Sequence, residues 1–564
     1  MKEQKLALIG FMILLAISLL QCKSKPTEEN ELQKQLDDYF KQEVLSNSED
    51  TECPGLSIII TEKDSIIYIG NFGLSNLENK TKITENTVFD IASTSKQFTG
   101  MAIAILEDQG KINVSYKIVK YLPDLPECMH EITIYQLVHH TSGIRDWPAL
   151  FGLQGWQAED QLSIDDIYEL LKKQKSINFN TGTGFLYSNS NYNLLIKIIE
   201  EATNIPFQVW VSENIFSPLD MNNTFYVAKD NKTNSSVACS YLHNGQNYLP
   251  FSNQLYAPGS SSLKSTTKDI SKWLINFYNF NLGDKSILER TTQKGKLSNG
   301  DEINYGYGLN ITKVKNMNVY AHDGAWGGYR TITAFFPEQQ VGVVILSNNG
   351  TLNPQELIND IVDIIFKLEK EKETKASDTE EVEINNEFFA LCAGKYEQVD
   401  DKGCYLTFFK EGNEYFVNIY DNDYKLYAKS DSVFYVKEAE AEFVFHLEDG
   451  KVNSHTLNQN GNSYLAIKEL EEKNECKINF NHLTGSYYSS ELDVEYEIIY
   501  EDKNLKIRTD VFPMEISLEY YKGMSFSCST GLIQSISFIE NNGIINSLSI
   551  SNPRAKNILF QKIN

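Results

Sequence analysis

The first two thirds of the chain alternate between stretches with helical and with strand periodicity. Apolar residues recur at helical spacing over residues 30–45, which predicts an amphipathic helix. The runs GLSIII and DSIIYIGNFG follow, separated by TEKD, and they predict the two strands of a hairpin. From Ser93 to Asp108 the period is helical again, and Gly110 is a plausible helix stop.

The later part of this region returns to strands. The runs VYAHDG, YRTITAFFP and QVGVVILSN, between residues 317 and 348, predict three strands, and residues 354–370 predict one more amphipathic helix. Between the two groups of strands, helices are predicted at 164–173, 191–202, 206–215 and 267–279. This order predicts an α+β domain over residues 46–370, whose sheet is completed by its late strands.

The character of the chain changes after residue 370. The charged segment 371–385 has no apolar period and predicts a linker. Beyond it, short alternating runs such as YFVNIYD and SVFYVK are separated by turn residues, which predicts an all-β sandwich or barrel without helices. AGKYE at 393–397 is echoed by TGSYY at 484–488, so we expect two small barrel-like β domains. Their predicted bounds are 386–470 and 478–564.

The N-terminal residues have the features of an export signal. A lysine-containing start precedes an apolar run that is too short for a comfortable membrane span. The run ends in SLLQC, which resembles the lipobox of bacterial lipoproteins, although Gln21 is larger than the residue usual there. We expect a signal peptide over 1–21, a lipidated Cys22, and a linker and helix over 22–45. An ordinary signal sequence with an incidental cysteine is the alternative.

Either form of this signal takes the protein out of the cytoplasm. With the lipid, we expect a protein anchored to a membrane of the bacterial cell envelope, facing the periplasm or the cell surface. The oligomeric state is left open.

Composition and charge narrow the expected partners. The 564 residues are 41% hydrophobic and 23% charged, as in globular proteins with large cores. The net charge of −25 would be repelled by a phosphate backbone, so no nucleic acid is expected. The cysteines form no CxxC pair and the eight histidines do not cluster at ligand spacing, so no metal is expected.

Candidate chemistry begins with the run STSK, Ser93 to Lys96, at a strand-to-helix passage. A serine at a helix N-terminus lies near free N–H groups and the positive end of the helix dipole. Lys96 follows one turn later on the same face, and a lysine can act as the base if burial lowers its pKa. An N-cap serine beside a solvated lysine explains the spacing equally well. The same SxxK spacing occurs at Ser261/Lys264 and Ser265/Lys268.

Two further motifs follow in serial order. Tyr187-Ser188-Asn189 precedes a predicted helix, where the tyrosine could relay a proton and the Asn189 amide could hold a substrate carbonyl. His322-Asp323-Gly324 ends a strand; residues 322 and 324 share a face, and the glycine would let a substrate approach the backbone. Chance matches to these two motifs occur at 420–422 and 243–245. Chance does not explain all three motifs in order, each in a suitable local structure.

Five segments together resemble the serial signatures of the serine β-lactamase-related family. They are FDIASTSK, LVHHTSGIRD, YSNSNYNLLIKIIE, IFSPLDMNNT and HDGAWGGYRT. The family includes class C β-lactamases, D-alanyl-D-alanine carboxypeptidases, D-aminopeptidases and esterases, and the resemblance covers about residues 30–370. It implies the β-lactamase/penicillin-binding-protein fold and an acyl-enzyme mechanism that needs no cofactor.

The resemblance also implies roles for single residues. Ser93 would form the acyl-enzyme, Lys96 would activate it, and Tyr187 would act as general base and later as acid. The N–H groups of Ser93 and Ala325 would form the oxyanion hole. The residues implied to bind substrate are Asn189, His322, Gly324 and Ala325. Trp326, beside Ala325, is expected to line the pocket.

His322 departs from the K-T-G lysine that binds carboxylates in β-lactamases and penicillin-binding proteins. Histidine here is similar to D-aminopeptidases and family esterases, which predicts poor β-lactam hydrolysis. We expect a small-molecule or peptide substrate: D-amino-acid peptides or peptidoglycan fragments first, then small esters, and β-lactams last.

The alternative from another class is a catalytically weak binding protein that acts through its C-terminal β domains. The layout also resembles D-aminopeptidases, in which two barrels follow the catalytic domain and one reaches into the cleft. No residue of 386–564 stands out as a site from the sequence.

Overall fold

The computed structural model of the chain describes residues 28–45, 52–157, 160–226, 237–252, 254–367, 384–399, 405–412, 414–419, 422–436, 441–448, 450–459, 462–469, 478–530 and 532–563. The predicted signal peptide, Cys22 and most of the predicted linker lie outside these residues. Within them, no helix has the length and apolar character needed to cross a membrane.

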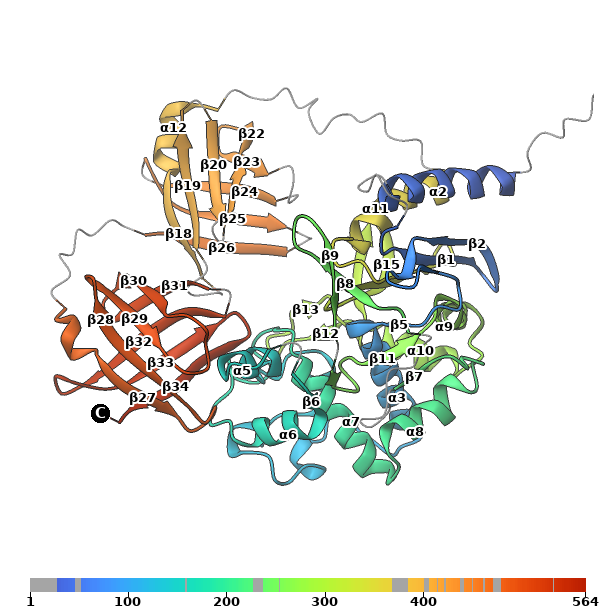
Figure 1. Cartoon of the computed structure of the whole chain (residues 1–564), viewed down its shortest axis with the longest axis horizontal. Coiled ribbons are helices and arrows are strands. Elements are labelled where there is room, and N and C mark those ends of the chain that lie inside the picture. Colours follow the sequence, from blue (N-terminus) through green and yellow to red (C-terminus); the bar gives the residue numbers. More distant parts are fainter. Residues whose placement is uncertain are drawn as a thin grey trace, which may run out of the picture.

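A six-stranded antiparallel sheet lies at the centre of the first domain (Figure 1), in the order β14-β15-β16-β17-β1-β2. Its strands are β1 (Leu56–Glu62), β2 (Ser65–Phe72), β14 (Asn310–Val314), β15 (Met317–Trp326), β16 (Tyr329–Phe336) and β17 (Val341–Ser347). Strand β1 pairs with β17 from Leu56↔Ser347 to Glu62↔Val341. The prediction that late strands complete an early sheet is therefore confirmed.

Helices cover both faces of this sheet. Helix α9 (Thr267–Asn279) packs on β1 and β17, while α2 (Glu28–Leu45) and α11 (Pro354–Ile365) contact each other and the strands β2 and β16. Neighbouring residues of β1 therefore enter different cores. Ile59 joins the core shared with the helical region, whereas Ile58 and Ile60 join the core beneath α2 and α11.

The helical region between the two groups of strands carries the site. Its helices are α3 (Lys96–Asp108), α4 (Ile134–Val138), α5 (Trp147–Leu153), α6 (Ile164–Lys172), α7 (Asn189–Thr203), α8 (Phe207–Val211) and α10 (Lys285–Thr291). The short helices α5 and α10 were not predicted, because seven residues show too little of a helical period. The helix predicted over 206–215 is α8 followed by a π-helical turn, and α11 ends at Ile365 instead of near residue 370.

Short strands pair between these elements. They are β3 (Leu74–Asn76) with β4 (Thr81–Lys82), β5 (Phe89–Asp90) and β7 (Phe225–Tyr226) with β11 (Leu263–Ser265), β6 (Leu162–Ser163) with β10 (Leu255–Tyr256), β8 (Ser240–His243) with β9 (Tyr248–Phe251), and β12 (Gly295–Lys296) with β13 (Glu302–Ile303).

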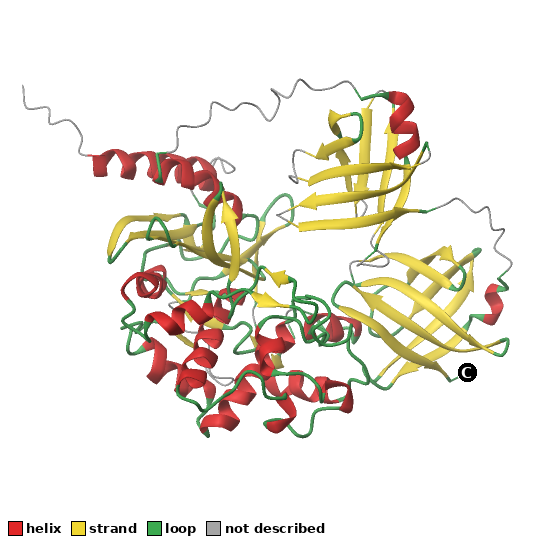
Figure 2. Cartoon of the chain, turned by 180° about the vertical axis from the view of Figure 1, so that it is seen from behind, coloured by secondary structure: helices red, strands yellow, loops and turns green. Residues whose placement is uncertain are grey.

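The last part of the chain is a closed barrel, which we call the second barrel. Figure 2 shows it beside the helical region, with the other β unit above it. Its strands are β27 (Gly485–Ser489), β28 (Val494–Glu501), β29 (Asn504–Arg508), β30 (Ile516–Lys522), β31 (Ser525–Thr530), β32 (Ile533–Asn541), β33 (Ile544–Asn552) and β34 (Ala555–Lys562).

The preceding β unit, which we call the first barrel, has the strand order β21-β20-β19-β18-β26-β25-β24-β23-β22. Its strands are β18 (Gly394–Gln398), β19 (Tyr405–Glu411), β20 (Glu414–Ile419), β21 (Asn422–Lys425), β22 (Tyr427–Ser430), β23 (Val433–Val436), β24 (Ala441–Glu448), β25 (Lys451–Gln459) and β26 (Asn462–Lys468). The two outer strands of this order, β21 and β22, are consecutive and separated by Leu426. One interrupted strand thus pairs with β20 and then with β23, which closes the sheet.

The predicted echo between the two β units marks equivalent positions. Gly394 and Gly485 open β18 and β27 with φ of 136° and 134°, and Tyr396 and Tyr487 are fully buried two residues later. The prediction that these domains lack helices was wrong for the first barrel, where α12 (Asn386–Cys392) precedes β18. The side-chain oxygen of Asn385 caps this helix by accepting hydrogen bonds from the N–H groups of Glu387 and Phe388. The helix is too short to give a visible period in the sequence.

Candidate active site

Ser93 lies in a 3₁₀ turn, Ala92–Ser95, between β5 and α3. Ala92 has a left-handed backbone with φ of 47°, which is unfavourable for a residue that carries a Cβ. The Asp90 carboxylate holds this turn by accepting a hydrogen bond of 2.8 Å from the Ala92 N–H. Lys264 pairs with Asp90 at 2.6 Å, so this lysine of a competing SxxK match anchors the nucleophile turn.

Lys96 points at the nucleophile from the first turn of α3. Its Nζ donates to Ser93 Oγ at 3.1 Å, to Asn189 Oδ1 at 2.8 Å and to the Ser260 carbonyl at 2.7 Å. The side chain is fully buried. Burial lowers the pKa of Lys96 to about 7, against the opposing field of the Asp146 carboxylate. Near neutral pH a large fraction of Lys96 is uncharged and can accept a proton.

Asp146 supports Lys96 through Asn189. Asn189 begins α7, and its backbone N–H and side-chain Nδ2 donate to the two Asp146 carboxylate oxygens at 2.7 and 3.2 Å. The carboxylate therefore caps the N-terminus of α7, where free N–H groups and the helix dipole favour negative charge. The Asn189 side-chain oxygen then faces Lys96, which leaves one amide hydrogen for the predicted substrate contact.

Tyr187 lies beside Lys96, whose Nζ is 4.9 Å from the centre of the Tyr187 ring. Burial raises the pKa of Tyr187 well above its ordinary value, although a hydrogen bond with Ser93 lowers it in part. Tyr187 is therefore a phenol at rest. This state fits the acid half of its predicted role, whereas Lys96 is better suited to accept the serine proton.

His322 lies on β15, and its ring centre is 6.1 Å from that of Tyr187. Its Nδ1 donates to the Asp323 carbonyl at 2.6 Å, which leaves Nε2 to accept from the Tyr305 hydroxyl at 3.0 Å. Burial lowers the pKa of His322 to about 4. His322 is therefore neutral at pH 7, and it does not replace the positive charge of a K-T-G lysine.

Gly324 allows two backbone segments to meet behind the nucleophile. A Cβ at this position would lie 2.5 Å from the Ile91 carbonyl oxygen and 3.1 Å from the Ser93 nitrogen. The glycine was expected to let a substrate approach the backbone of β15. In the structure, the segment that approaches Gly324 closely is the turn that carries Ser93. Ala325 lies beyond Ala321, the last residue of β15 that pairs with β14. Strand β15 contacts the Ala92–Ser95 turn, and the oxyanion hole is predicted between this turn and Ala325.

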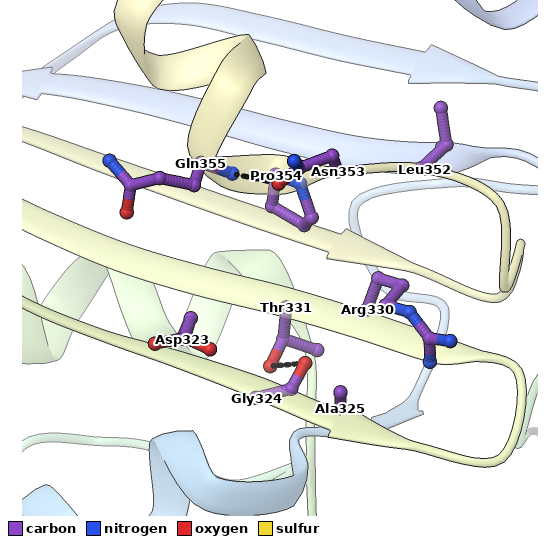
Figure 3. A pocket seen from close by; sticks show the side chains of 9 residues that line it. All are labelled: Asp323, Gly324, Ala325, Arg330, Thr331, Leu352, Asn353, Pro354 and Gln355. Atoms are coloured by element: carbon purple, nitrogen blue, oxygen red, sulfur yellow. Dashed lines mark hydrogen bonds between the residues drawn. The ribbon is translucent and has the colours of Figure 1, made fainter. Parts of the chain in front are cut away.

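A separate pocket of about 310 Å³ lies behind β15, between the β15–β16 hairpin and the start of α11 (Figure 3). Asp323 and Ala325 present their side chains to it, because they alternate along the strand with residues that face Ser93. Thr331 Oγ1 donates to the Gly324 carbonyl and helps to separate the two sides. The pocket and the catalytic site therefore share a strand and lie on opposite faces of it.

The second barrel brings Arg554 to the site. Its Nη1 pairs with Asp146 Oδ2 at 3.0 Å, and its guanidinium carbon lies 5.2 Å from the centre of the Tyr187 ring. Sequence reasoning missed both Asp146 and Arg554. Asp146 stood inside a family signature, but Arg554 lies in a turn, SNPRAKN, that carries no local sign of chemistry. The two residues are 408 positions apart.

Arg145, the neighbour of Asp146, holds the barrel turn in place. Its fully buried guanidinium donates to the carbonyls of Lys556 and Asn557, and it pairs with buried Glu491 at 2.5 Å. Such charge-assisted contacts fix geometry well, because each needs a definite position of both partners. The barrel is thereby positioned against the residues that hold Lys96.

Three tryptophans form an apolar wall beside the predicted oxyanion hole. The ring centres of Trp147, Trp156 and Trp326 lie between 6.0 and 6.4 Å apart. Trp326 is partly exposed next to Ala325. Trp326 does not line the pocket of Figure 3, and its expected contact with substrate stays a prediction.

A comparison with known families matches the Beta-lactamase family to residues 34–364. The chain belongs to the β-lactamase family. Among relatives, penicillin-binding protein 4* of Bacillus subtilis is 24% identical over 433 residues, which cover 73% of this β-lactamase-family chain and 94% of the relative. A D-aminopeptidase of Gluconobacter oxydans is 24% identical over 297 residues, which cover 52% and 56% of the two chains.

The fold of this β-lactamase-family chain also resembles solved structures. The octameric penicillin-binding protein homologue from Pyrococcus abyssi superposes with a TM-score of 0.54 at 19% identity, covering 78% of this chain and all of that one. The predicted family and fold class are thus confirmed. The predicted site residues Ser93, Lys96, Tyr187 and Asn189 lie together, and β15 brings His322, Gly324 and Ala325 behind or beside them.

Proposed function

We propose that this chain is a serine hydrolase that cleaves amide bonds of D-amino-acid peptides or peptidoglycan fragments through an acyl-enzyme on Ser93. The buried Nζ of Lys96, 3.1 Å from Ser93 Oγ, is the observation that carries the proposal. Its pKa of about 7 makes it a base that works near neutral pH. The relatives named penicillin-binding protein and D-aminopeptidase support this class of substrate.

The site residues suit a two-step acyl transfer. Ser93 Oγ attacks the amide carbonyl as the hydroxyl proton of Ser93 passes to Lys96. The oxyanion then accepts hydrogen bonds from the N–H groups of Ser93 and Ala325. The leaving amine takes the proton of Tyr187, and the Lys96 ammonium then returns a proton to the Tyr187 oxygen. Water attacks the acyl-enzyme in the reverse sense, so that Ser93 recovers its proton and the acid is released.

Small esters are the next expected substrates, and β-lactams the last. Neutral His322 stands where family enzymes that bind β-lactam carboxylates have a lysine. Recognition of an anionic substrate therefore has to come from another residue.

Mass spectrometry after exposure to a fluorophosphonate tests the proposal, with hydrolysis of p-nitrophenyl acetate followed in parallel. We expect one adduct on Ser93, and its loss together with turnover in Ser93→Ala. Ser261→Ala is the matched control, because Ser261 also begins an SxxK match; it should keep both. Absence of an adduct and of turnover in the wild type would favour the alternative, a binding protein that acts through its β domains.

We also propose that the protein works at a membrane of the cell envelope, anchored by a lipid on Cys22. The lipobox-like SLLQC supports this localisation. Full-length protein should enter the detergent phase in a Triton X-114 partition, and Cys22→Ser should move it to the aqueous phase. Unchanged partition of the variant would contradict the lipid anchor.

A further inference from the structure

The catalytic domain places two basic residues near Ser93, Lys96 and His322, but neither of them is a permanent cation at neutral pH. Lys96 is buried, has a pKa of about 7, and directs its Nζ at three oxygen atoms of the protein. His322 is neutral, and both of its ring nitrogens already form hydrogen bonds, with the Tyr305 hydroxyl and the Asp323 carbonyl. A substrate carboxylate would therefore find no lasting cation on either residue.

Arg554 supplies a lasting cation from the second barrel. A guanidinium stays charged at all pH values at which the protein is folded. The ion pair with Asp146 uses one of its five N–H donors, and Asp146 is the acceptor found for it among the residues that the structure describes. Its side chain is 48% exposed. The outer edge of the guanidinium is thus open to a ligand beside Tyr187.

The position of Arg554 is fixed by its backbone. Its carbonyl accepts hydrogen bonds from the Asp146 N–H at 3.1 Å and from Asn178 Nδ2 at 3.0 Å, and its N–H donates to Asn552 Oδ1 at 3.0 Å. These bonds remain when the side chain is changed. The guanidinium is held in addition by Asp146 and by the face of the Tyr187 ring.

We propose that Arg554 binds a carboxylate of the substrate close to the scissile amide, so that the second barrel completes the active site. A planar guanidinium can bind a carboxylate through two parallel hydrogen bonds. The inference rests on the proposed function and names its substrate class: N-acylated peptides that end, next to the cleaved bond, in a D-amino acid with a free carboxylate. A substrate with a free ammonium at that place is repelled.

Two matched peptides test this in the full-length protein. N-acetyl-D-alanyl-D-alanine has the carboxylate, and its C-terminal carboxamide lacks it; cleavage is followed by release of D-alanine or D-alaninamide. The wild type should prefer the acid by about tenfold or more in kcat/KM. Arg554→Gln should abolish most of this preference, mainly by raising KM for the acid, and Arg554→Lys should keep part of it.

Arg508→Gln is the matched control. Arg508 is also an arginine of the second barrel, but its ion pairs are with Glu497, Glu501 and Glu515 on the barrel surface. This variant should keep the preference for the acid. Thermal melting of each variant shows whether it is folded, and Arg554→Lys gives a second comparison at the same position.

Two outcomes would overturn the inference. One is a wild type that does not prefer the acid. The other is an unchanged preference in Arg554→Gln; if kcat/KM then fell equally for both peptides, Arg554 would act only by positioning Asp146. In each case a fluorophosphonate adduct on Ser93 would leave the proposed function standing, whereas a wild type without that adduct would contradict the function itself.

Discussion

The two C-terminal barrels share their local construction. In each, a buried tyrosine donates to the backbone carbonyl four residues earlier, at 2.7 Å for Tyr396 and 2.8 Å for Tyr487. In each, a lysine of the last strand lies opposite this tyrosine in register and over its ring, Lys468 in the first barrel and Lys562 in the second. The same sequence signals therefore build the same unit twice.

The barrels differ in what their outer residues contact. The core of the first barrel is a cluster of its own, whereas the core of the second is continuous with that of the helical region. Tyr496 of the second barrel donates to the Leu153 carbonyl at 2.6 Å, and Gln154 donates to the Leu492 carbonyl. A few residues of a common unit thus decide whether it packs against the domain that carries the candidate active site.

The strongest test of this difference between the barrels removes the side chain of Arg145, which binds the second barrel through Glu491 and two backbone carbonyls. Arg145→Ala leaves Glu491 buried without its partner, so we expect the unfolding free energy to fall by about 3–5 kcal/mol. Because Asp146 and Arg554 lose their common support, kcat/KM should fall about 100-fold. Denaturant unfolding and ester hydrolysis measure the two effects.

The first barrel offers the control for this change. Lys429 pairs with Glu442 on its surface, and exposed pairs contribute less than about 1 kcal/mol. Lys429→Ala should therefore leave stability and turnover nearly unchanged. A similar small effect of Arg145→Ala would contradict the view that the second barrel is docked through this contact.

The pH dependence of catalysis sharpens the comparison further. Lys96 must be neutral to accept the serine proton, so kcat/KM should fall as the pH drops through about 7, roughly tenfold per pH unit below it. The charge of Arg554 lowers the pKa of Lys96. Arg554→Gln should therefore move this acid limb to higher pH.

A profile of kcat/KM for p-nitrophenyl acetate against pH measures the shift. Lys429→Gln removes the same charge from the first barrel and should leave the limb in place. If both variants gave the wild-type profile, the second barrel would have no electrostatic influence on Lys96.

The smallest predicted effect concerns the interior of the first barrel. His455 is fully buried, and neither ring nitrogen has a hydrogen-bond partner within the described residues. Leu548 is its counterpart in the second barrel, because Ala466 and Phe560, their cross-strand partners, each precede the equivalent lysine by two residues. The rings around His455 are those of Tyr396, Phe408, Phe443 and Phe445.

Burial lowers the pKa of His455 to about 3 in the folded state, below the ordinary value of 6.5. Protonation of His455 therefore does not reduce the stability of the first barrel above about pH 6.5. It reduces this stability progressively as the pH falls from there toward 3. His455→Leu should remove this acid loss and stabilise the first barrel by about 1–3 kcal/mol. Hydrogen exchange of the amides of 384–469 at pH 7 and at lower pH measures both.

The reciprocal variant Leu548→His should transfer the acid sensitivity to the second barrel. If His455→Leu exchanged faster than the wild type at both pH values, the imidazole would be a stabilising part of its core, contrary to this account.

Much of the site could be predicted because its signals are local. Ser93 and Lys96 lie one helical turn apart, and Tyr187 and Asn189 lie together at the N-terminal end of α7, so short-range geometry places each pair. Gly324 shows the limit of prediction from short-range geometry. Its motif was recognised, but the atoms that approach it come from the turn around Ser93, which no spacing along β15 reveals.

The sequence by itself determined the periods of the helices and strands, the serial order of the three motifs and the family. These depend on neighbours within a few residues, and such patterns can be read along the chain. Only the tertiary structure decided the partners of the buried charges. Asp146 meets Arg554 across 408 positions, and Arg145 meets Glu491 across 346. A buried charge needs a partner, but the side chain that provides it depends on which surfaces pack together when the chain folds.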